Sequence, residues 1–387
     1  MPHARRIAIV GAGPIGLEAA LFARQSGFDV TVFERGTIAA NVQAWGHVRL
    51  FSPFSLNASP WGCEALKQHG HPLPGDEELL TGRAFAERYL VPLSQLPELD
   101  GCIREQTQVR SIGRAGQLKH QHIGKPARQQ TPFRLLLSHQ QGEQIEQGDY
   151  VLDCSGTYPH HNWLGDGGMP CLGERNGLTQ KSYELPDILG KDRERFANGL
   201  TLIVGSGYSA ATAIVALGEL AKTHPQTKAI WLTRSESELP ITPIPEDSLP
   251  ERKRLTTLAN QLALSDEGPI EWWQGRVVHS IFHGADHRWH ITITNHSDQS
   301  VRVVANEVLA LVGYRPDRAL YEELQVHECY ASQGPMKLAA ALIGDTSTDC
   351  LAQTGHGRET LKNPEPGFFI LGAKSYGRNP RYLIKLA

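Results

Sequence analysis

The sequence predicts an α/β protein built from two doubly wound domains, the second inserted into the first. Two observations carry this prediction. A pattern of apolar strand, glycine-rich turn, helix and second apolar strand occurs twice, at residues 7–34 and again at 200–235. Apolar strands also stand on both sides of the second copy, at 150–154 and 368–371. A chain of 387 residues is long enough for two domains that each bury a core.

The first copy has the residues of a dinucleotide-binding turn. Gly11, Gly13 and Gly16 follow the first apolar run. In that order they permit a tight turn, let the main chain approach a pyrophosphate, and allow close helix packing. The helix that follows offers unpaired N–H groups and the positive end of its dipole to phosphate. Glu34 ends the second strand, where a carboxylate accepts hydrogen bonds from ribose hydroxyls.

The second copy repeats this turn with a different charge at its end. Gly205, Gly207 and Ala210 form a G-x-G-x-x-A pattern between a strand and a helix. Arg234 stands where the first copy has its acid. A guanidinium pairs with a 2′-phosphate, which a carboxylate would repel, so this site is predicted to prefer NADPH over NADH. A solvated surface arginine is the alternative interpretation of Arg234.

A helix is predicted at residues 80–96. Thr81 is a plausible N-cap, and Phe85, Tyr89 and Leu93 recur at steps of four on one face. Their aromatic rings are therefore expected in the core.

The other regions are assigned from their composition. Residues 41–75 are expected to be irregular, and a long irregular segment in a compact domain is more often functional than idle. Residues 116–130 read as a loose hairpin tip without chemistry, residues 271–312 as further strands, and residues 381–386 as a final helix.

Composition excludes several classes of function. The chain is 40% apolar and 20% charged, which is typical of a soluble globular protein, and no apolar run reaches membrane-spanning length. Its net charge of −3 and scattered Lys and Arg residues provide no basic field for nucleic acid. The six cysteines and 17 histidines show no metal-binding spacing, so no metal is predicted. A small-molecule partner is expected.

The N-terminus has one feature of a secretory signal peptide, because Arg5 and Arg6 precede an apolar run. However, Glu18 and a Gly-Pro turn interrupt that run, and a second strand continues the pattern. We therefore predict a cytoplasmic protein.

Both glycine turns, together with the strands that run into Gly/Pro exits at 155–159 and 313–316, resemble a known superfamily. It is that of the two-dinucleotide-binding-domain flavoproteins, which include flavin-containing and N-hydroxylating monooxygenases and thioredoxin reductase-like enzymes. In layout the resemblance covers nearly the whole chain. It implies two Rossmann-like (FAD/NAD(P)-binding) domains, with FAD on the first and NADPH on the second.

On this resemblance, residues 1–165 and 313–387 form the FAD-binding domain, residues 195–312 form the NADPH-binding domain, and residues 166–194 are a linker. The residues assigned to cofactor binding lie at the glycine turns, at strand ends and in the segments that follow them. They are Gly11, Gly13, Pro14, Ile15, Gly16, Glu34, Arg35, Trp45, His47, Gly156, Gly205, Ser206, Gly207, Tyr208, Ser209, Ala210, Arg234, Gly313, Gly372 and Lys374.

Two residues are candidates for catalysis. His47 could hold or deliver a proton near neutral pH, and Arg378 lies close to the C-terminal strand exit. The alternatives are a structural histidine in a loop and ordinary loop polarity.

The sequence departs from the superfamily pattern at three points. The disulfide reductases carry a redox cysteine pair, whereas the closest cysteines here, Cys154 and Cys171, are far apart, so no dithiol relay is expected. Relatives have Gly-Asp after the C-terminal strand, and its carboxylate holds the ribityl chain of the flavin. This chain has Gly372 followed by Ala373 and Lys374, which puts that contact in doubt and leaves main-chain N–H groups as the alternative. The F-x-G-x-x-x-H motif of flavin-containing monooxygenases is absent.

The resemblance implies an FAD-dependent, NADPH-using monooxygenase that oxygenates a small-molecule substrate with dioxygen. Two alternatives stay open. One is an NAD(P)H-dependent flavin reductase or oxidase without a redox dithiol, and the other is a non-catalytic protein that binds flavin or NADPH. The sequence carries no signal for the oligomeric state.

Overall fold

The chain forms two compact units in the computed structural model, which describes residues 4–379 except 159, 298, 345, 346, 348 and 353–356. One unit comprises Met1–His160 and Arg315–Ala387, and the other comprises His161–Tyr314. The second unit is therefore inserted into the first. The predicted helix at 381–386 lies outside the described residues.

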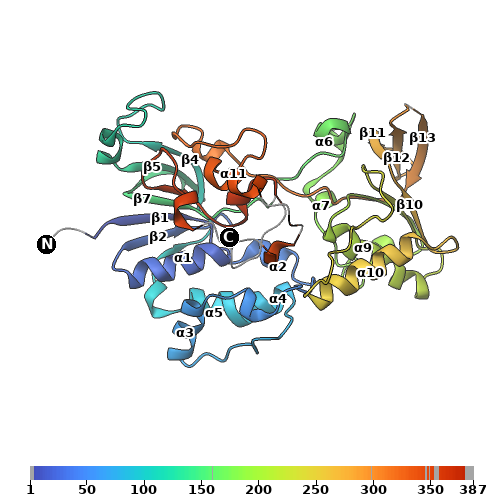
Figure 1. The fold of residues 1–387 in the computed structure, drawn as a ribbon, viewed down its shortest axis with the longest axis horizontal. Coiled ribbons are helices and arrows are strands. Elements are labelled where there is room, and N and C mark those ends of the chain that lie inside the picture. Colours follow the sequence, from blue (N-terminus) through green and yellow to red (C-terminus); the bar gives the residue numbers. More distant parts are fainter. Residues whose placement is uncertain are drawn as a thin grey trace. The chain divides into compact units, whose positions relative to one another are not determined.

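The first unit is built on a parallel sheet with the strand order β15-β7-β1-β2-β3 (Figure 1). Its strands are β1 (Arg6–Val10), β2 (Asp29–Phe33), β3 (Ile103–Arg104), β7 (Tyr150–Asp153) and β15 (Phe368–Ile370). A separate antiparallel sheet consists of β4 (Gln108–Arg114), β5 (Phe133–His139) and β6 (Gly142–Gly148). The helices are α1 (Pro14–Gln25), α2 (Ala40–Ala44), α3 (Pro60–Gln68), α4 (Gly82–Phe85), α5 (Val91–Ser94) and α11 (Met336–Gly344).

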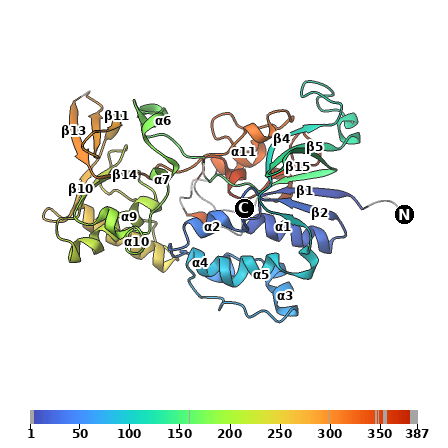
Figure 2. The same cartoon turned by 180° about the vertical axis from the view of Figure 1, so that it is seen from behind.

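The two faces of this parallel sheet are covered by different layers, because side chains alternate along each strand. Ile7 and Ile9 of β1 belong to a core that includes the buried face of α1 and side chains of α3. Ala8 and Val10 belong to another core, which includes the antiparallel sheet. Seen from behind, the unit again has α1 next to β1 and β2, with α3, α4 and α5 beyond it (Figure 2). The unit is thus layered around one sheet.

The helix predicted at 80–96 is confirmed. Thr81 Oγ1 accepts a main-chain hydrogen bond at 3.2 Å, as an N-cap does. Phe85, Tyr89 and Leu93 are fully buried. The helix is not uniform, because a π-helical turn at Ala86–Leu90 separates α4 from α5.

The second unit repeats the design with a parallel sheet of order β10-β9-β8-β14. Its strands are β8 (Leu200–Val204), β9 (Lys228–Leu232), β10 (Ile270–Trp273) and β14 (Glu307–Ala310). An antiparallel sheet consists of β11 (Arg276–His283), β12 (Trp289–Asn295) and β13 (Ser300–Ala305). The helices are α6 (Glu174–Gly177), α7 (Gln180–Tyr183), α8 (Arg193–Phe196), α9 (Tyr208–Thr223) and α10 (Pro250–Ala263).

The topologies of the two units correspond strand by strand. In each, the first strand lies between the second strand and a strand that comes after a three-stranded antiparallel meander. The order β7-β1-β2-β3 in the first unit matches β14-β8-β9-β10 in the second, and β15 is an addition to the first. The predicted α/β fold class is confirmed, with parallel sheets in both units.

Residues 166–194, expected as a linker, lie inside the second unit and are anchored there by a buried carboxylate. Glu174, which is 1% exposed, accepts hydrogen bonds from Leu164 N at 3.0 Å, Cys171 N at 2.8 Å and the Tyr183 hydroxyl at 2.8 Å. A buried carboxylate needs such donors, so it orders the chain around it. This segment is therefore a packed part of the unit.

The chain leaves the first unit and returns to it through neighbouring residues. His161 and Tyr314 form an antiparallel bridge, and Asn162 N donates a hydrogen bond to Gly313 O at 2.9 Å. In the first unit, Arg315 N donates to His160 O at 2.7 Å. The two ends of the inserted unit therefore lie side by side.

The expected loose tip at 116–130 is also ordered, because it contributes to a buried charge cluster. Glu365 accepts hydrogen bonds from Arg114 Nε and Arg128 Nε, each at 2.8 Å, and the three side chains are at most 1% exposed. Gln325 N donates to the same carboxylate at 2.8 Å. The cluster joins this segment to residues far away in the sequence, a partnership that local sequence pattern does not reveal.

Glu365→Gln is expected to destabilise the protein by about 3–5 kcal/mol, because two buried guanidinium groups lose their counter-charge. Urea unfolding followed by circular dichroism measures the change. Glu359→Gln is the matched control: Glu359 pairs with Lys362 on the surface, where an ion pair contributes about 0–1 kcal/mol. Equal stability of the two variants would contradict the structural role of the cluster.

Candidate functional site

The glycine turn of the first unit is required by the packing of the main chain. Gly11 has φ +98°, and a Cβ atom there would lie 2.9 Å from Cys154 O. A Cβ on Gly16 would lie 1.9 Å from Gly11 O. Only glycine fits both positions, so β1, the end of β7 and α1 approach each other as the sequence predicts.

Gly13 has no such requirement. It is the N-cap of α1, its φ of −82° suits any residue, and a Cβ atom there would meet nothing within 4 Å. The protein's own packing therefore does not explain the glycine. The open space lies at the N-terminus of a helix, where N–H groups and the helix dipole favour phosphate. A dinucleotide pyrophosphate fits this position.

Glu34 lies beside the same turn, at the end of β2. Its Oε2 accepts a hydrogen bond from Ala12 N and its Oε1 accepts one from Gly36 N, both at 2.8 Å. The carboxylate therefore holds the turn. Each oxygen has a further lone pair, and the side chain is half-buried, so both oxygens can still accept hydrogen bonds from ribose hydroxyls. The neighbouring Arg35 is exposed.

The glycine turn of the second unit has the same division of roles. Gly205 has φ +134°, and a Cβ there would lie 2.2 Å from Leu311 O. Gly207, the N-cap of α9, has nothing within 4 Å of such a Cβ. Ala210 is fully buried, as close packing of the helix requires. Of the other residues assigned to this turn, Ser206 and Ser209 are exposed and Tyr208 is half-buried.

Arg234 lies two residues beyond β9. The sequence predicts it where the first unit has Glu34, but the strand register differs by one. Val10 pairs with Phe33 and Val204 with Leu232, so Thr233 corresponds to Glu34 and Arg234 to Arg35. The Arg234 side chain is exposed, and within the part of the chain that the structure describes it forms no ion pair. A guanidinium in this setting is available to a phosphate. The two units therefore carry opposite charges just after their second strands, at positions that differ by one residue in register.

Three predicted strand exits have glycines in the left-handed region. Gly156 has φ +69°, Gly313 has φ +81° and Gly372 has φ +77°. A Cβ on Gly372 would lie 3.3 Å from the Ile15 side chain, at the start of α1. The structure thus brings the C-terminal exit of the first unit against its glycine turn, at the carboxyl ends of parallel strands, where ligands of α/β proteins bind.

Lys374 is held by a partner that the sequence analysis did not identify. Its Nζ lies 2.6 Å from Asp153 Oδ2 and 3.1 Å from Ser155 Oγ, and both members of the ion pair are fully buried. The Ser155 hydroxyl donates to Asp153 Oδ1 at 2.6 Å. The pair fastens the segment after β15 to the end of β7. The ammonium group of Lys374 thus already has an anion within the protein, and its role in cofactor binding stays a prediction.

The remaining predicted residues lie in the irregular segments. Trp45 packs against the core of the first unit, and a Cβ on Gly82 would lie 2.6 Å from its ring. His47 is half-buried. Arg378 Nε donates to Gln333 Oε1 at 3.1 Å, and burial, followed by the charge of a neighbouring arginine, lowers the pKa of this guanidinium. The cofactor and catalytic roles of these residues stay predictions.

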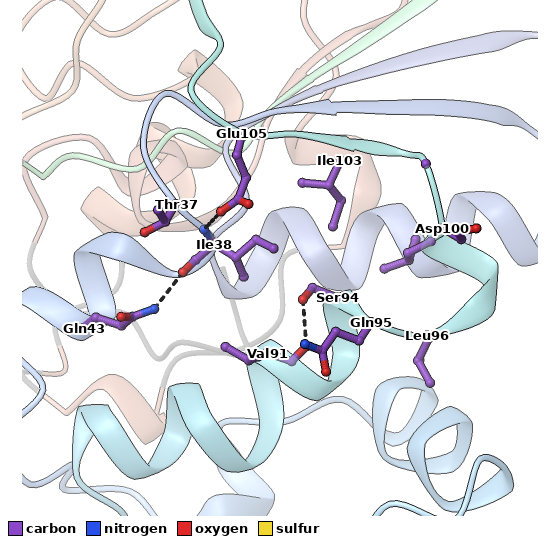
Figure 3. Close-up of a pocket in the computed structure, with 12 residues that line it drawn as sticks. Thr37, Ile38, Gln43, Val91, Ser94, Gln95, Leu96, Asp100, Ile103 and Glu105 are labelled. Carbon is purple, nitrogen blue, oxygen red and sulfur yellow. Dashed lines mark hydrogen bonds between the residues drawn. The ribbon is translucent and has the colours of Figure 1, made fainter.

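A pocket of about 550 Å³ lies near the ends of β2 and β3 (Figure 3). Glu105 Oε1 accepts a hydrogen bond from Ile38 N at 2.7 Å, and Gln43 Nε2 donates to Ile38 O at 2.9 Å, so one wall is held in place. Asp100 and Glu105 are its charged lining residues, and it contains none of the predicted site residues. Its acidic lining does not suit a pyrophosphate.

The six cysteines all belong to the described part of the chain, and none forms a disulfide. Among the described residues, no group of His, Cys, Asp and Glu side chains could hold a metal ion. No described helix has both the length and the apolarity needed to cross a membrane.

Comparison with known proteins supports the fold. Residues 8–122 match the family described as pyridine nucleotide-disulphide oxidoreductase. No curated protein matches the chain in sequence.

Three solved structures have similar folds. Bacillithiol disulfide reductase Bdr from Bacillus cereus is 17% identical, with a TM-score of 0.67 over 99% of this chain and 95% of that chain. An ornithine N-hydroxylase from Kutzneria sp. 744 is 14% identical, with a TM-score of 0.64 over 100% and 96%. Thioredoxin reductase from Lactococcus lactis is 15% identical, with a TM-score of 0.55 over 95% and 90%. These likenesses confirm the predicted fold.

Gly13→Val is expected to leave stability within about 1 kcal/mol of the wild type, because the new side chain enters open space, while weakening FAD binding at least about tenfold. Thermal unfolding and FAD titration measure the two effects. Gly16→Val is the contrasting variant, since its Cβ would overlap Gly11 O, and it is expected to fold poorly. Unchanged FAD affinity in a well-folded Gly13→Val protein would show that no pyrophosphate lies there.

Asp153→Asn is expected to cost about 3–5 kcal/mol, because the buried ammonium of Lys374 loses its counter-charge. The double variant Asp153→Leu with Lys374→Met should recover most of that stability, because an apolar pair needs no compensation. Urea unfolding of the three proteins completes the comparison. A double variant less stable than Asp153→Asn would contradict the ion-pair explanation.

Proposed function

We propose that this chain is an FAD-dependent oxidoreductase that takes its electrons from NADPH. The observation that carries the proposal is the pair of glycine turns, each with one glycine facing open space at a helix N-terminus, at Gly13 and Gly207. Glu34 holds the first turn through its hydrogen bond with Ala12 N, and Arg234 lies two residues beyond β9, the strand next to β8 of the second turn. The related Kutzneria hydroxylase is described with reduced FAD, NADP⁺ and L-ornithine, which supports the same cofactors here.

In this proposal the first unit holds FAD. The main chain around Gly13 and the N-terminus of α1 bind the pyrophosphate, and Glu34 accepts hydrogen bonds from the ribose. The buried pair of Lys374 and Asp153 fixes the segment after β15 at the same sheet edge. FAD, when bound, would supply the redox chemistry between NADPH and the electron acceptor, and the chain would contribute orientation and electrostatics.

We propose further that the electrons serve to insert one atom of dioxygen into a small-molecule substrate. The cysteines support this over a dithiol mechanism, because a thiol must ionise to react. Burial raises the pKa of the Cys154 thiol, and burial together with Glu174 raises the pKa of Cys171 to about 12. These two are the closest cysteines in the sequence, and both are therefore unreactive near neutral pH.

A second candidate is an NADPH-dependent reductase, and it is favoured by one cysteine. Cys329 is half-exposed, and its Sγ accepts a hydrogen bond from Ser332 N at 3.5 Å. The hydroxyl and N–H of Ser332, with the N–H of Ala331, lower the pKa of this thiol. A bacillithiol disulfide reductase is among the structural relatives. A single activated thiol is compatible with disulfide reduction.

NADPH is expected to bleach the visible absorbance of the FAD-loaded protein under anaerobic conditions, and to do so at lower concentration than NADH. Anaerobic titration followed by absorbance tests this. A protein that binds no FAD would contradict the proposal at its base, and bound flavin that NADPH fails to reduce would indicate a non-catalytic ligand.

Oxygen insertion and disulfide reduction are separated by their products and by one variant. With ¹⁸O₂ and a panel of small amines, a monooxygenase yields a product that carries the label, and Cys329→Ser retains this activity. A reductase consumes NADPH with a low-molecular-weight disulfide, and Cys329→Ser abolishes that consumption. Cys350→Ser is the matched control, since this cysteine is also partly exposed.

A further inference from the structure

The turn after β10 runs beside the end of β9 in the second unit. Thr233 N donates a hydrogen bond to Trp273 O at 3.0 Å, and Arg276 N donates to Thr233 O at 3.2 Å. The main chain of Arg276 is therefore bonded to the residue that precedes Arg234. Two arginines that are far apart in the sequence start from adjacent main-chain positions.

This turn is fixed by more than those two hydrogen bonds. Gly275 has φ +62°, a left-handed conformation that favours glycine, and the Glu236 side chain of the loop after β9 lies against it. Ser237 N also donates to Gln274 Oε1 at 3.0 Å. The loop after β9 is thus packed on the turn after β10, which fixes the main chain next to both arginines.

Neither guanidinium group has a carboxylate partner in the described part of the chain. Over the residues that the structure describes, neither Arg234 nor Arg276 forms an ion pair, although the carboxylate of Glu236 lies against Gly275 nearby. Arg276 Cζ lies 5.3 Å from the centre of the Trp273 ring. A cation–π contact orients the guanidinium without neutralising it. Arg276 is thus an oriented cation whose main chain lies next to that of Arg234, and a pair of cations suits a dianion.

We propose that Arg276 acts with Arg234 to bind the 2′-phosphate of NADPH, and so determines the preference of the second unit for the phosphorylated nucleotide. The inference rests on the proposed function, which places NADPH on this unit. It adds a residue from a different strand, because the glycine motif and the end of β9 indicate Arg234 alone. Arginine suits this role, since its planar fork matches phosphate oxygens in pairs.

Binding of two nucleotide fragments tests the proposal without relying on turnover. Isothermal titration of the FAD-loaded protein with adenosine 2′,5′-bisphosphate and with 5′-AMP compares ligands that differ in the 2′-phosphate. Arg276→Gln is expected to weaken the bisphosphate roughly ten- to hundredfold and to leave 5′-AMP unchanged, as is Arg234→Gln. Arg276→Lys should lose less, because it keeps the charge.

Arg302→Gln is the matched control, an exposed arginine on β13 of the same unit, and it should bind both fragments as the wild type does. If Arg276→Gln binds the bisphosphate as tightly as the wild type while Arg234→Gln does not, the assignment of Arg276 is overturned and the proposed function stands. If the wild type binds neither fragment, the nucleotide site of the proposed function fails as well. Circular dichroism confirms that each variant is folded.

Discussion

The fold of both units depends on a contact between main-chain atoms that leaves no room for a side chain. In the first unit, Gly11 lies against the carbonyl of Cys154, just after β7. In the second, Gly205 lies against the carbonyl of Leu311, just after β14. β7 and β14 are equivalent in topology, so both units contain the same contact. The contact packs each glycine turn against the neighbouring strand, while the N-caps of α1 and α9, Gly13 and Gly207, border open space.

Both units share this main-chain arrangement, but they differ in the charged residue that follows the second strand, Glu34 in the first unit and Arg234 in the second. Glu34 has two tasks, because its oxygens already hold Ala12 N and Gly36 N in the turn. Arg234 forms no ion pair with any residue that the structure describes. The carboxylate of Glu34 therefore also stabilises the glycine turn of the first unit, whereas, in the described structure, the guanidinium of Arg234 does not stabilise the turn of the second. A change of nucleotide preference is structurally less costly in the second unit than in the first.

The sequence was sufficient for features that depend on local pattern. Strand and helix positions around both glycine turns follow from apolar periodicity, and the Thr81 cap follows from its position before a helical run. The sequence was not sufficient for partnerships across long separations. From sequence, Asp153 belongs to an apolar strand and Lys374 is a predicted cofactor contact. Their ion pair forms only because β7 and β15 are neighbours in the folded sheet.

Partnerships across long sequence separations also explain why two segments, expected as a linker and as a loose hairpin tip, are ordered in the structure. Residues 166–194 and 116–130 are polar and lack periodicity, which is typical of linkers and loose tips. Each contains one charged residue that is buried in the folded chain, Glu174 in the first and Arg128 in the second. A buried charge orders its surroundings through its hydrogen bonds, and a pattern of apolar residues gives no sign of it.

The antiparallel bridge between His161 and Tyr314 has a consequence for the ancestry of the chain. A domain whose two ends lie side by side can be inserted between two neighbouring residues of another domain without moving those residues apart. Here the first-unit residues on either side of the inserted unit, His160 and Arg315, are hydrogen-bonded to each other. The chain thus has the architecture that duplication of a single ancestral module, followed by recombination of one copy into the other, would leave behind.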